Sequence, residues 1–330
     1  MRPAAVHPFN AVLRLAIGAS LSLLLAKLTD SDSWGVFFTI GPVLLLGLLP
    51  TLNAFLLKQF VASTVVSGSI VFIYQWLGGY GPVLTLLLFG YFFWLFRLMA
   101  GGVFFVFAAT ALINSSIFLH FASYPGLDAG AMLENSVLAN LAAMLIALSL
   151  TYLLPTAPPP PRPAPPPVPT THLLVLAFLV TASFLAFQWL DLKDSLSAQA
   201  STLLILLPLQ FSAIVQAGLK RATGVLLGSA YAVLCQVLLY NHYQQIALVL
   251  PLFFLGMLLF ARAQQKEGPG SGVAFGGMTT MAIIFGQYLT PSQDMMYSAL
   301  YRISSVTVAV GIMLAIATCA FHALAKGNKN

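Results

Sequence analysis

Charged residues are scarce in this sequence, and that scarcity excludes most classes of protein. Only 7% of the 330 residues are Asp, Glu, Lys or Arg, while 59% are hydrophobic. Soluble domains carry about 25% charged residues, so an ordinary soluble enzyme is excluded. A disordered tail and a fibrous protein are excluded as well, because neither has such a high apolar content. The composition is that of a chain whose surface lies largely in an apolar environment.

Cysteine is also rare, and the short motifs that carry common chemistry are missing. Cys235 and Cys319 each lie inside an apolar segment, so we interpret them as small buried residues rather than a disulfide or a metal site. The sequence contains no HExxH, GxSxG or Walker A motif and no paired-cysteine metal spacing. We therefore expect no catalytic residues, no metal and no cofactor, and we expect that the protein is not an enzyme.

Apolar blocks of about 20 residues, the length that spans ~30 Å of hydrocarbon, recur along the whole chain. Runs such as residues 44–49 do not alternate polar and apolar side chains, as the strands of a membrane β-barrel would. The sequence predicts an all-α integral membrane protein with about twelve transmembrane helices. The expected helices cover residues 10–28, 34–52, 56–77, 80–98, 101–120, 130–154, 172–190, 198–216, 221–240, 244–262, 271–289 and 292–323.

The basic residues are distributed unevenly between the two ends of these helices. With the N-terminus placed in the cytoplasm, only Lys27, Lys193 and Arg302 fall on the outer half, and the other Lys and Arg residues fall on the inner side. This is the bias of the positive-inside rule, so we predict that both termini are cytoplasmic. Residues 29–32 do not form a cleavage site, so we expect the first span to be retained. Scattered basic residues also predict a lipid bilayer, and not a nucleic acid, as the partner.

A proline-rich segment divides the chain. Residues 155–169 contain ten prolines, which predict an extended polyproline II conformation. We expect residues 155–171 to form a cytoplasmic linker between residues 1–154 and residues 172–330. The linker is either a semi-rigid spacer or a PxxP docking motif.

The two halves of the chain resemble each other at a shift of 162 residues. Leu57-Lys58-Gln59 aligns with Leu219-Lys220-Arg221, and the segment around Asn140 aligns with the segment around Arg302. Each half is predicted to hold six spans, so both halves begin on the same side of the membrane. The sequence therefore predicts two parallel six-helix repeats, 1–154 and 172–330, with a substrate pathway where they meet.

Arg302 is the charge that lies deepest in a predicted span. Residues 290–293 have the pattern of a helix start, which places Arg302 eleven residues, or ~16 Å, along its helix. Asp128 can cap the corresponding helix of the first half, which places Asn140 at the same depth. A charge at that depth costs several kcal/mol, so we interpret Arg302 as an anion-binding residue and Asn140 as its uncharged counterpart.

Acidic residues near the outer surface leave an alternative open. Arg302 could extend outward, or pair with Asp294 or Glu134. The same two carboxyl groups and His120 are the candidates for proton coupling. The sequence contains no nucleotide-binding domain, so ATP is not the chain's own energy source.

Two further groups of residues are candidates for a transport pathway. The fifth and eleventh predicted spans are rich in small and polar residues, and Thr110, Asn114 and Thr280 either line the pathway or serve close helix packing. Prolines interrupt three predicted spans and are candidates for gating, because a proline leaves a helical carbonyl without its partner. These prolines are Pro42, Pro208 and Pro251.

A short motif resembles a known family. Lys220-Arg221-Ala222-Thr223-Gly224 running to Gly228, and Arg302 followed by Gly311, resemble the fusaric-acid-resistance and aromatic acid exporter superfamily. The likeness is to its short bacterial inner-membrane branch and, more distantly, to the plant aluminium-activated malate transporters. The first half has Lys58-Gln59 but lacks the glycine pair.

The resemblance implies a function. It implies an inner-membrane exporter of small organic anions, often aromatic carboxylic acids, driven by membrane potential or a proton gradient. It also implies a periplasmic adaptor of the membrane-fusion type as a partner, and it leaves the oligomeric state open. A passive anion channel and a non-transporting membrane subunit of an efflux or assembly complex are the alternatives.

Overall fold

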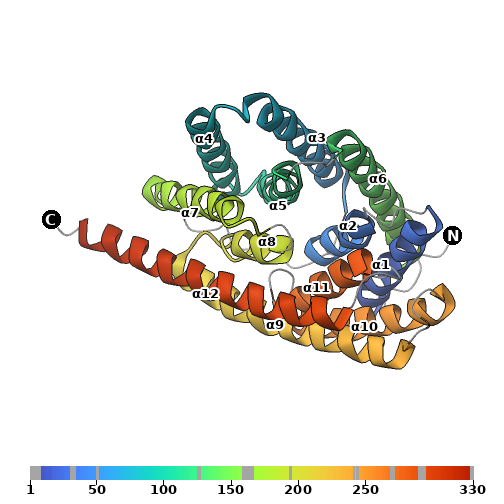
Figure 1. The fold of residues 1–330 in the computed structure, drawn as a ribbon. Helices are drawn as coiled ribbons and strands as arrows, with labels where there is room; N and C mark the ends of the chain where they lie inside the picture. Colours follow the sequence, from blue (N-terminus) through green and yellow to red (C-terminus); the bar gives the residue numbers. More distant parts are fainter. Residues whose placement is uncertain are drawn as a thin grey trace. The chain divides into compact units, whose positions relative to one another are not determined.

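The computed structural model is entirely helical over the residues that it describes. These are residues 9–29, 35–49, 52–124, 128–157, 167–192, 195–240, 242, 245–267, 272–288 and 295–327. They form twelve helices, shown in Figure 1, and no strand. The helices are α1 (Asn10–Leu28), α2 (Gly35–Leu48), α3 (Ala54–Leu77), α4 (Gly81–Ala100), α5 (Phe105–Ala122), α6 (Ala129–Leu153), α7 (Thr170–Trp189), α8 (Leu196–Leu204), α9 (Phe211–Leu239), α10 (Ile246–Glu267), α11 (Val273–Tyr288) and α12 (Met295–Gly327).

Nine of the helices in the described ranges are long and apolar enough to cross a membrane. The other three, α2, α8 and α11, have 14, 9 and 16 residues. At 1.5 Å per residue α8 is only ~14 Å long, less than half of the ~30 Å hydrocarbon thickness. The prediction of an all-α membrane protein with about twelve helices is confirmed, and nine of the helices in the described ranges are long enough to span the membrane alone.

The eighth and ninth predicted spans differ most from the structure. Helix α8 ends at Leu204, and α9 begins at Phe211 instead of residue 221. Pro208 has no N–H to continue a helix, and Leu209 has a φ of 64°, so the chain turns here. Pro208 therefore lies in a turn between two helices, and not inside a span. We expected Lys220 just before a span and Arg221 at its first position, but both lie within the 29 residues of α9.

The helices pack into two compact units, and each unit combines helices from both halves of the chain. Unit 1 comprises residues 1–53, 131–161 and 220–304, and unit 2 comprises residues 54–130, 162–219 and 305–330. Unit 1 contains α1, α2, α10, α11 and α6 from Ala131 onward, and unit 2 contains α3, α4, α5, α7 and α8. The long helices α9 and α12 each contribute residues to both units.

The same pattern of helix contacts occurs in both units. In unit 1, α1 contacts α2, α10 and α11, and α11 also contacts α2 and α10. In unit 2, α7 contacts α8, α4 and α5, and α5 also contacts α8 and α4. Helices α7, α8, α4 and α5 of unit 2 correspond to α1, α2, α10 and α11 of unit 1. The two members of each pair are six helices apart along the chain. This recurrence supports the proposed division of the chain into two six-helix repeats.

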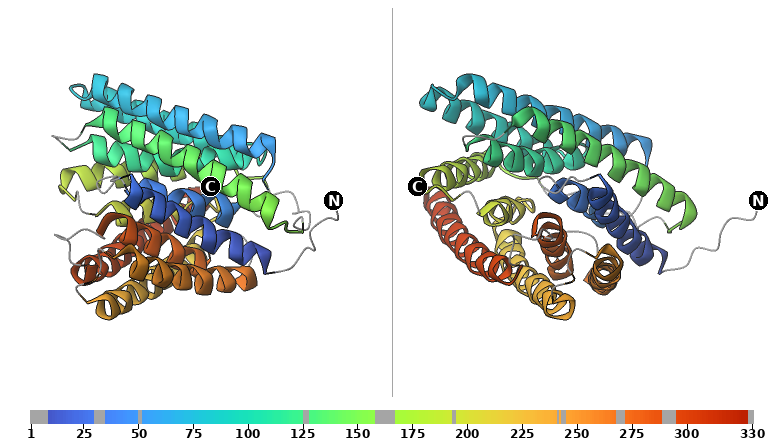
Figure 2. Two further views of the ribbon diagram at one scale, coloured as in Figure 1. Left: turned by 90° about the vertical axis from the view of Figure 1, so that its right-hand side faces the viewer. Right: turned by 45° about the vertical axis from the view of Figure 1, so that its right-hand side comes forward.

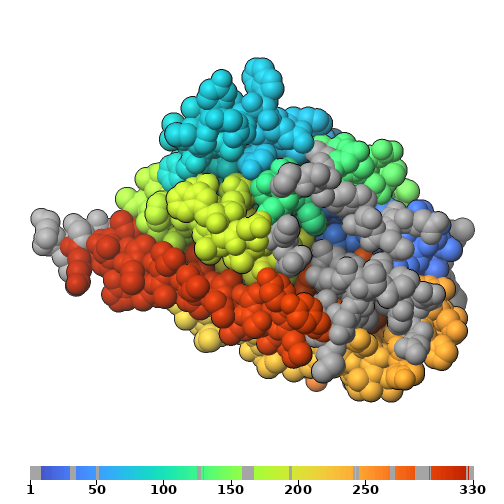
Figure 3. All heavy atoms as spheres, viewed as in Figure 1, coloured from blue at the N-terminus to red at the C-terminus, as the bar shows by residue number. Residues whose placement is uncertain are grey.

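Counterpart helices are also buried to the same degree. Almost every residue of α2 and α8 is buried, and so are the described side chains of α11 from Ala274 onward and those of α5 from Phe107 to His120. Helices that are apolar on all sides are stable only in a protein interior or in lipid. The outer helices, in contrast, expose apolar side chains such as Trp76 and Val308. Figures 2 and 3 show α12 along one such surface.

Three local predictions have clear outcomes. Asp128 accepts a hydrogen bond from the Gly130 backbone N–H at 2.9 Å, so the predicted cap of α6 is confirmed. Cys235 is buried as expected, but Cys319 is exposed, because it lies on the outer surface of α12. Most of the proline-rich linker, the predicted helix start at 290–293 and Lys193 lie outside the described residues.

Candidate anion-binding site

The site is built on one face of α9. Arg221, Gly224 and Gly228 are spaced three and four residues apart, so they share that face. A Cβ atom at Gly224 would lie 2.4 Å from the Val273 carbonyl oxygen, and one at Gly228 would lie 2.6 Å from the Gly277 carbonyl oxygen. Only glycine permits such close approach of two helix backbones, a role that small residues often have in membrane proteins. Helix α9 therefore packs directly on the backbone of α11.

This close packing holds Arg221 against α11. Arg221 is only 5% exposed, and its Nη1 donates a hydrogen bond to the Thr279 hydroxyl oxygen at 2.6 Å. The same hydroxyl lies 3.0 Å from the Gly276 carbonyl oxygen and 3.1 Å from that of Phe275, so its proton is donated to the α11 backbone. The guanidinium is thus fixed by a side chain whose own orientation is fixed.

Arg302 of α12 brings a second buried cation to the site. It is 3% exposed and lies close enough to Arg221 for the two positive charges to repel each other. Burial excludes the alternative in which Arg302 extends outward to the surface. Neither guanidinium can lose its proton under ordinary conditions. Two buried like charges cost free energy, which the binding of an anion would offset.

Thr280 and Asn140 are the other predicted binding residues in unit 1. Thr280 is fully buried, and its hydroxyl has no hydrogen-bond partner within the described part of the chain. A Cβ atom at Gly228 would lie 3.0 Å from the Thr280 Cβ, so Thr280 borders the same contact between α9 and α11. Asn140 is half-buried on α6. Thr280 is therefore an available donor beside the helix contact that positions Arg221.

The remaining unit 1 candidates lie on other helices. Pro42 and Pro251 are inside α2 and α10, as predicted. Glu134 is exposed on α6, unlike the buried arginines. Asp294 lies outside the described residues.

The other predicted residues belong to unit 2, on α5. The Thr110 hydroxyl donates to the Val106 carbonyl oxygen of its own helix at 2.7 Å, a bond that suits packing as well as pathway lining. Asn114 is buried, and its Nδ2 has no hydrogen-bond partner among the residues described. His120 is 1% exposed and its Nδ1 is hydrogen-bonded to Oε1 of Gln199 on α8. The structure thus divides the predicted substrate-binding residues between the two units.

Both arginines have amide counterparts in the first half of the chain. The shift of 162 residues places Gln59 opposite Arg221 and Asn140 opposite Arg302. Gln59 is buried in unit 2, where its Nε2 donates to the Val103 carbonyl oxygen at 2.9 Å and its Oε1 accepts from the Phe107 N–H at 2.9 Å. The first half therefore has neutral side chains at the two positions where the second half has cations.

Sequence reasoning missed the role of Arg221. We expected this residue at the cytoplasmic start of a span over residues 221–240, because basic residues usually mark the inner ends of spans. A signal was present nonetheless: no proline lies between residues 211 and 239, and Arg221 has the helical spacing of the glycine pair. Both features predict one continuous helix with Arg221 on its packed face.

Long apolar helices with buried centres define the class: the chain is a multi-pass α-helical membrane protein. Residues 174–317 match the family described as fusaric acid resistance protein-like, and residues 11–154 match the family described as a protein of unknown function, DUF2955. The match over residues 174–317 confirms the resemblance of the second half of the chain to the fusaric acid resistance-like family. Arg221, Thr279, Thr280 and Arg302 all lie in that half. Comparisons with curated proteins and with solved structures gave no match.

Proposed function

We propose that the protein exports small organic anions, aromatic carboxylates in particular, across the bacterial inner membrane. The observation that supports this most directly is the pair of buried, mutually repelling arginines Arg221 and Arg302. The family description supports the substrate class, because fusaric acid is an aromatic carboxylic acid. Both termini are proposed to be cytoplasmic, and a periplasmic adaptor is the proposed partner.

The proposed chemistry is recognition of a carboxylate by arginine. A guanidinium presents a planar fork of N–H donors that matches the two oxygens of a carboxylate. The Thr279 hydroxyl already fixes one nitrogen of Arg221, so little side-chain freedom remains to be lost on binding. Thr280 and Asn140 would add neutral donors, and the low dielectric of a buried site strengthens each contact.

The membrane potential is sufficient as a driving force. An inside-negative potential favours outward movement of each negative charge by ~2.3 kcal/mol per 100 mV. Proton coupling is the proposed alternative, and His120 is its best-placed candidate because it is buried and hydrogen-bonded to Gln199 on a neighbouring helix. Pro42, Pro208 and Pro251 are the proposed hinges. Pro208 is the best placed of these, because it lies where α8 and α9 are separated.

The test is transport in inverted membrane vesicles with labelled benzoate as substrate. Arg302→Gln keeps much of the size and hydrogen bonding but removes the charge, so we expect normal abundance and strongly reduced uptake. Arg302→Lys should retain part of the activity, because a point charge remains without the planar fork. Arg262→Gln is the control, since it removes an exposed charge from α10.

Each outcome distinguishes the alternatives. Wild-type uptake by Arg302→Gln, in a well-expressed protein, would disprove the proposed site. Single-channel currents from purified protein would identify a passive anion channel. Liposomes that move no anion, together with a stoichiometric co-purifying protein, would identify a non-transporting subunit.

A further inference from the structure

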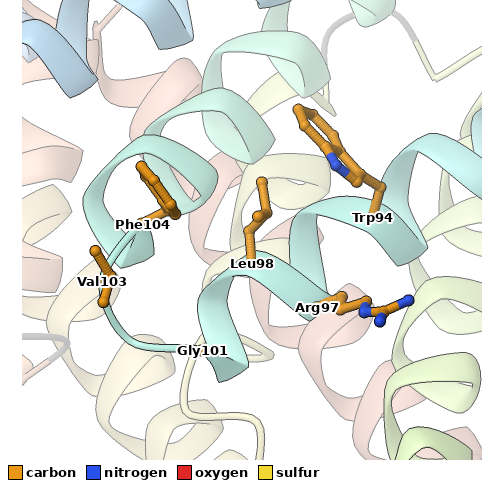
Figure 4. Close-up of a pocket in the computed structure, with 6 residues that line it drawn as sticks. All are labelled: Trp94, Arg97, Leu98, Gly101, Val103 and Phe104. Carbon is orange, nitrogen blue, oxygen red and sulfur yellow. The ribbon is translucent and has the colours of Figure 1, made fainter.

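A cavity of about 480 Å³ opens where α4 turns into α5 in unit 2. Its lining is mainly apolar and aromatic, with a single charged residue. Figure 4 shows Leu98 between the rings of Trp94 and Phe104 in this view, with Arg97 extending from the same turn of α4. Trp94 is 43% exposed and Phe104 is 46% exposed, so the cavity opens at the surface. An apolar hollow with one cation at its edge suits a molecule that is itself apolar with an anionic end.

The cation at the cavity is available for binding. Arg97 is exposed, and its guanidinium makes no hydrogen bond or ion pair with any residue that the structure describes. Lys58, at the start of α3, is exposed and equally without a partner in the described ranges. The rings of Phe55 and Phe104 lie 6.3 Å apart between centroids, so the start of α3 lies beside the turn that forms the cavity. The start of α3, which carries Lys58, and the turn from α4 to α5, which carries the cavity, therefore lie at the same end of these helices.

The wall of the cavity is held in a fixed conformation. Gly102 has a φ of 77°, which the tight turn from α4 to α5 requires and which only glycine adopts without strain. Gln59 of α3 clamps this turn through its hydrogen bonds to Val103 and Phe107. Because Gly102 and Gln59 both restrict the conformation of this turn, the cavity is a preformed feature and does not depend on a ligand to open it.

We propose that this cavity binds an anionic phospholipid, with the phosphate on Arg97 and an acyl chain against Leu98 and the rings of Trp94 and Phe104. Tryptophan and other aromatic residues mark the level of lipid headgroups in membrane proteins, and basic pockets on the cytoplasmic side bind anionic headgroups. The charge distribution of the sequence predicts that Arg97 and Lys58 lie on that side. The proposal is independent of the buried arginine pair, which lies in unit 1.

The test uses the full chain in phosphatidylcholine nanodiscs that contain a trace of photoreactive phosphatidylglycerol, with a diazirine on one acyl chain. After irradiation, mass spectrometry should locate the label on residues 94–104. Arg97→Gln should lower that labelling about fivefold, the effect of losing ~1 kcal/mol of attraction from one basic residue. Arg262→Gln, which removes an exposed charge from the counterpart helix α10, should leave the labelling unchanged.

Three results would overturn the proposal. These are equal labelling by a photoreactive phosphatidylcholine, labelling that Arg97→Gln does not change, and displacement of the label by free benzoate. The last result would assign the cavity to a soluble aromatic anion instead of a lipid. Arg302→Gln should label as the wild-type protein does, so failure of the exporter proposal and failure of the lipid proposal are separable.

Discussion

The contact between α9 and α11 in unit 1 and the contact between α3 and α5 in unit 2 are counterparts, yet they are built differently. In unit 1 the glycines at 224 and 228 bring the α9 backbone onto α11. In unit 2 the corresponding positions are Ala62 and Val66, which carry side chains. One pair of helices is therefore joined through its backbones, and the other must be joined through side chains.

In unit 2, hydrogen bonds from side chains join α3 to α5. Ser67 of α3 donates to the Ala111 carbonyl oxygen of α5 at 3.2 Å and accepts a bond from the Ser115 hydroxyl at 3.1 Å. The Tyr91 hydroxyl of α4 extends this network to Ser115 at 2.6 Å. In unit 1 the counterpart of Ser67 is Ser229, which is fully buried and has no hydrogen-bond partner within the described residues.

The difference shows how one repeated arrangement of helices can serve two purposes. In unit 2 the hydroxyls of Ser67, Ser115 and Tyr91 are bonded to one another, so the α3–α5 contact is suited to stability. Unit 1 leaves the Ser229 and Thr280 hydroxyls without bonds to any described residue and adds two buried cations, an arrangement that a bound anion would complete. Substitutions at matched positions of the two halves test whether the two units have these different roles.

The largest expected effect is that of Arg221→Gln, which gives the second half the residue of the first. Loss of a charged hydrogen-bond donor costs about 1.5–3 kcal/mol, so anion uptake should fall about tenfold to a hundredfold. Lys220→Gln is the matched control, because it removes the same charge from an exposed neighbour. The effect is measured as the initial rate of anion uptake in vesicles. Equal losses of this rate in both variants would show that uptake depends only on the net charge of the protein.

Gly228→Ala should weaken the packing of unit 1. The new Cβ atom would lie 2.6 Å from a backbone oxygen, so α9 and α11 must separate, at a cost of about 1–3 kcal/mol. Gly311→Ala on α12 is the control, because nothing lies within 4 Å of its Cβ position. Thermal unfolding in detergent should show a lower midpoint for Gly228→Ala alone. An unchanged midpoint would mean that the backbone contact contributes little.

Gln59→Leu should destabilise unit 2 without affecting anion recognition. The substitution leaves the Phe107 N–H at the start of α5 without its cap, which typically costs about 1 kcal/mol. The thermal midpoint should fall, while the KM for benzoate uptake stays at the wild-type value. A raised KM would place Gln59 in the transport pathway and remove the proposed contrast between the units.

The smallest effect on stability is expected for Thr280→Val. Its hydroxyl has no partner in the described structure, so the isosteric change should shift the thermal midpoint very little. If Thr280 donates to the anion, KM should rise about threefold, the value of one modest hydrogen bond. Thr110→Val is the comparison, because the hydroxyl of Thr110 is already bonded within α5. Equal KM values in both variants would exclude Thr280 from the site.

The environment of Arg14 illustrates a limit of reading charges from sequence. Arg14 lies one turn into the first span, where a lysine or arginine side chain can often reach the membrane surface. In the structure it is buried, and its two terminal nitrogens donate to the hydroxyls of Thr156 and Thr151 at 2.8 and 2.9 Å. Its partners are about 140 positions away in the chain, so no local pattern indicates them.

The properties that depend on local composition could be predicted from the sequence. Apolar blocks of spanning length predicted an all-α membrane protein, Asp128 predicted a helix start, and Lys220 to Gly228 indicated the family. Only the tertiary structure decided which residues meet. Helices of both halves mix in each unit, and Arg221 and Arg302 come together across 81 positions of the chain. The physical reason is that hydropathy and capping act within a few turns of a helix, whereas the pairing of distant helices depends on how their faces pack.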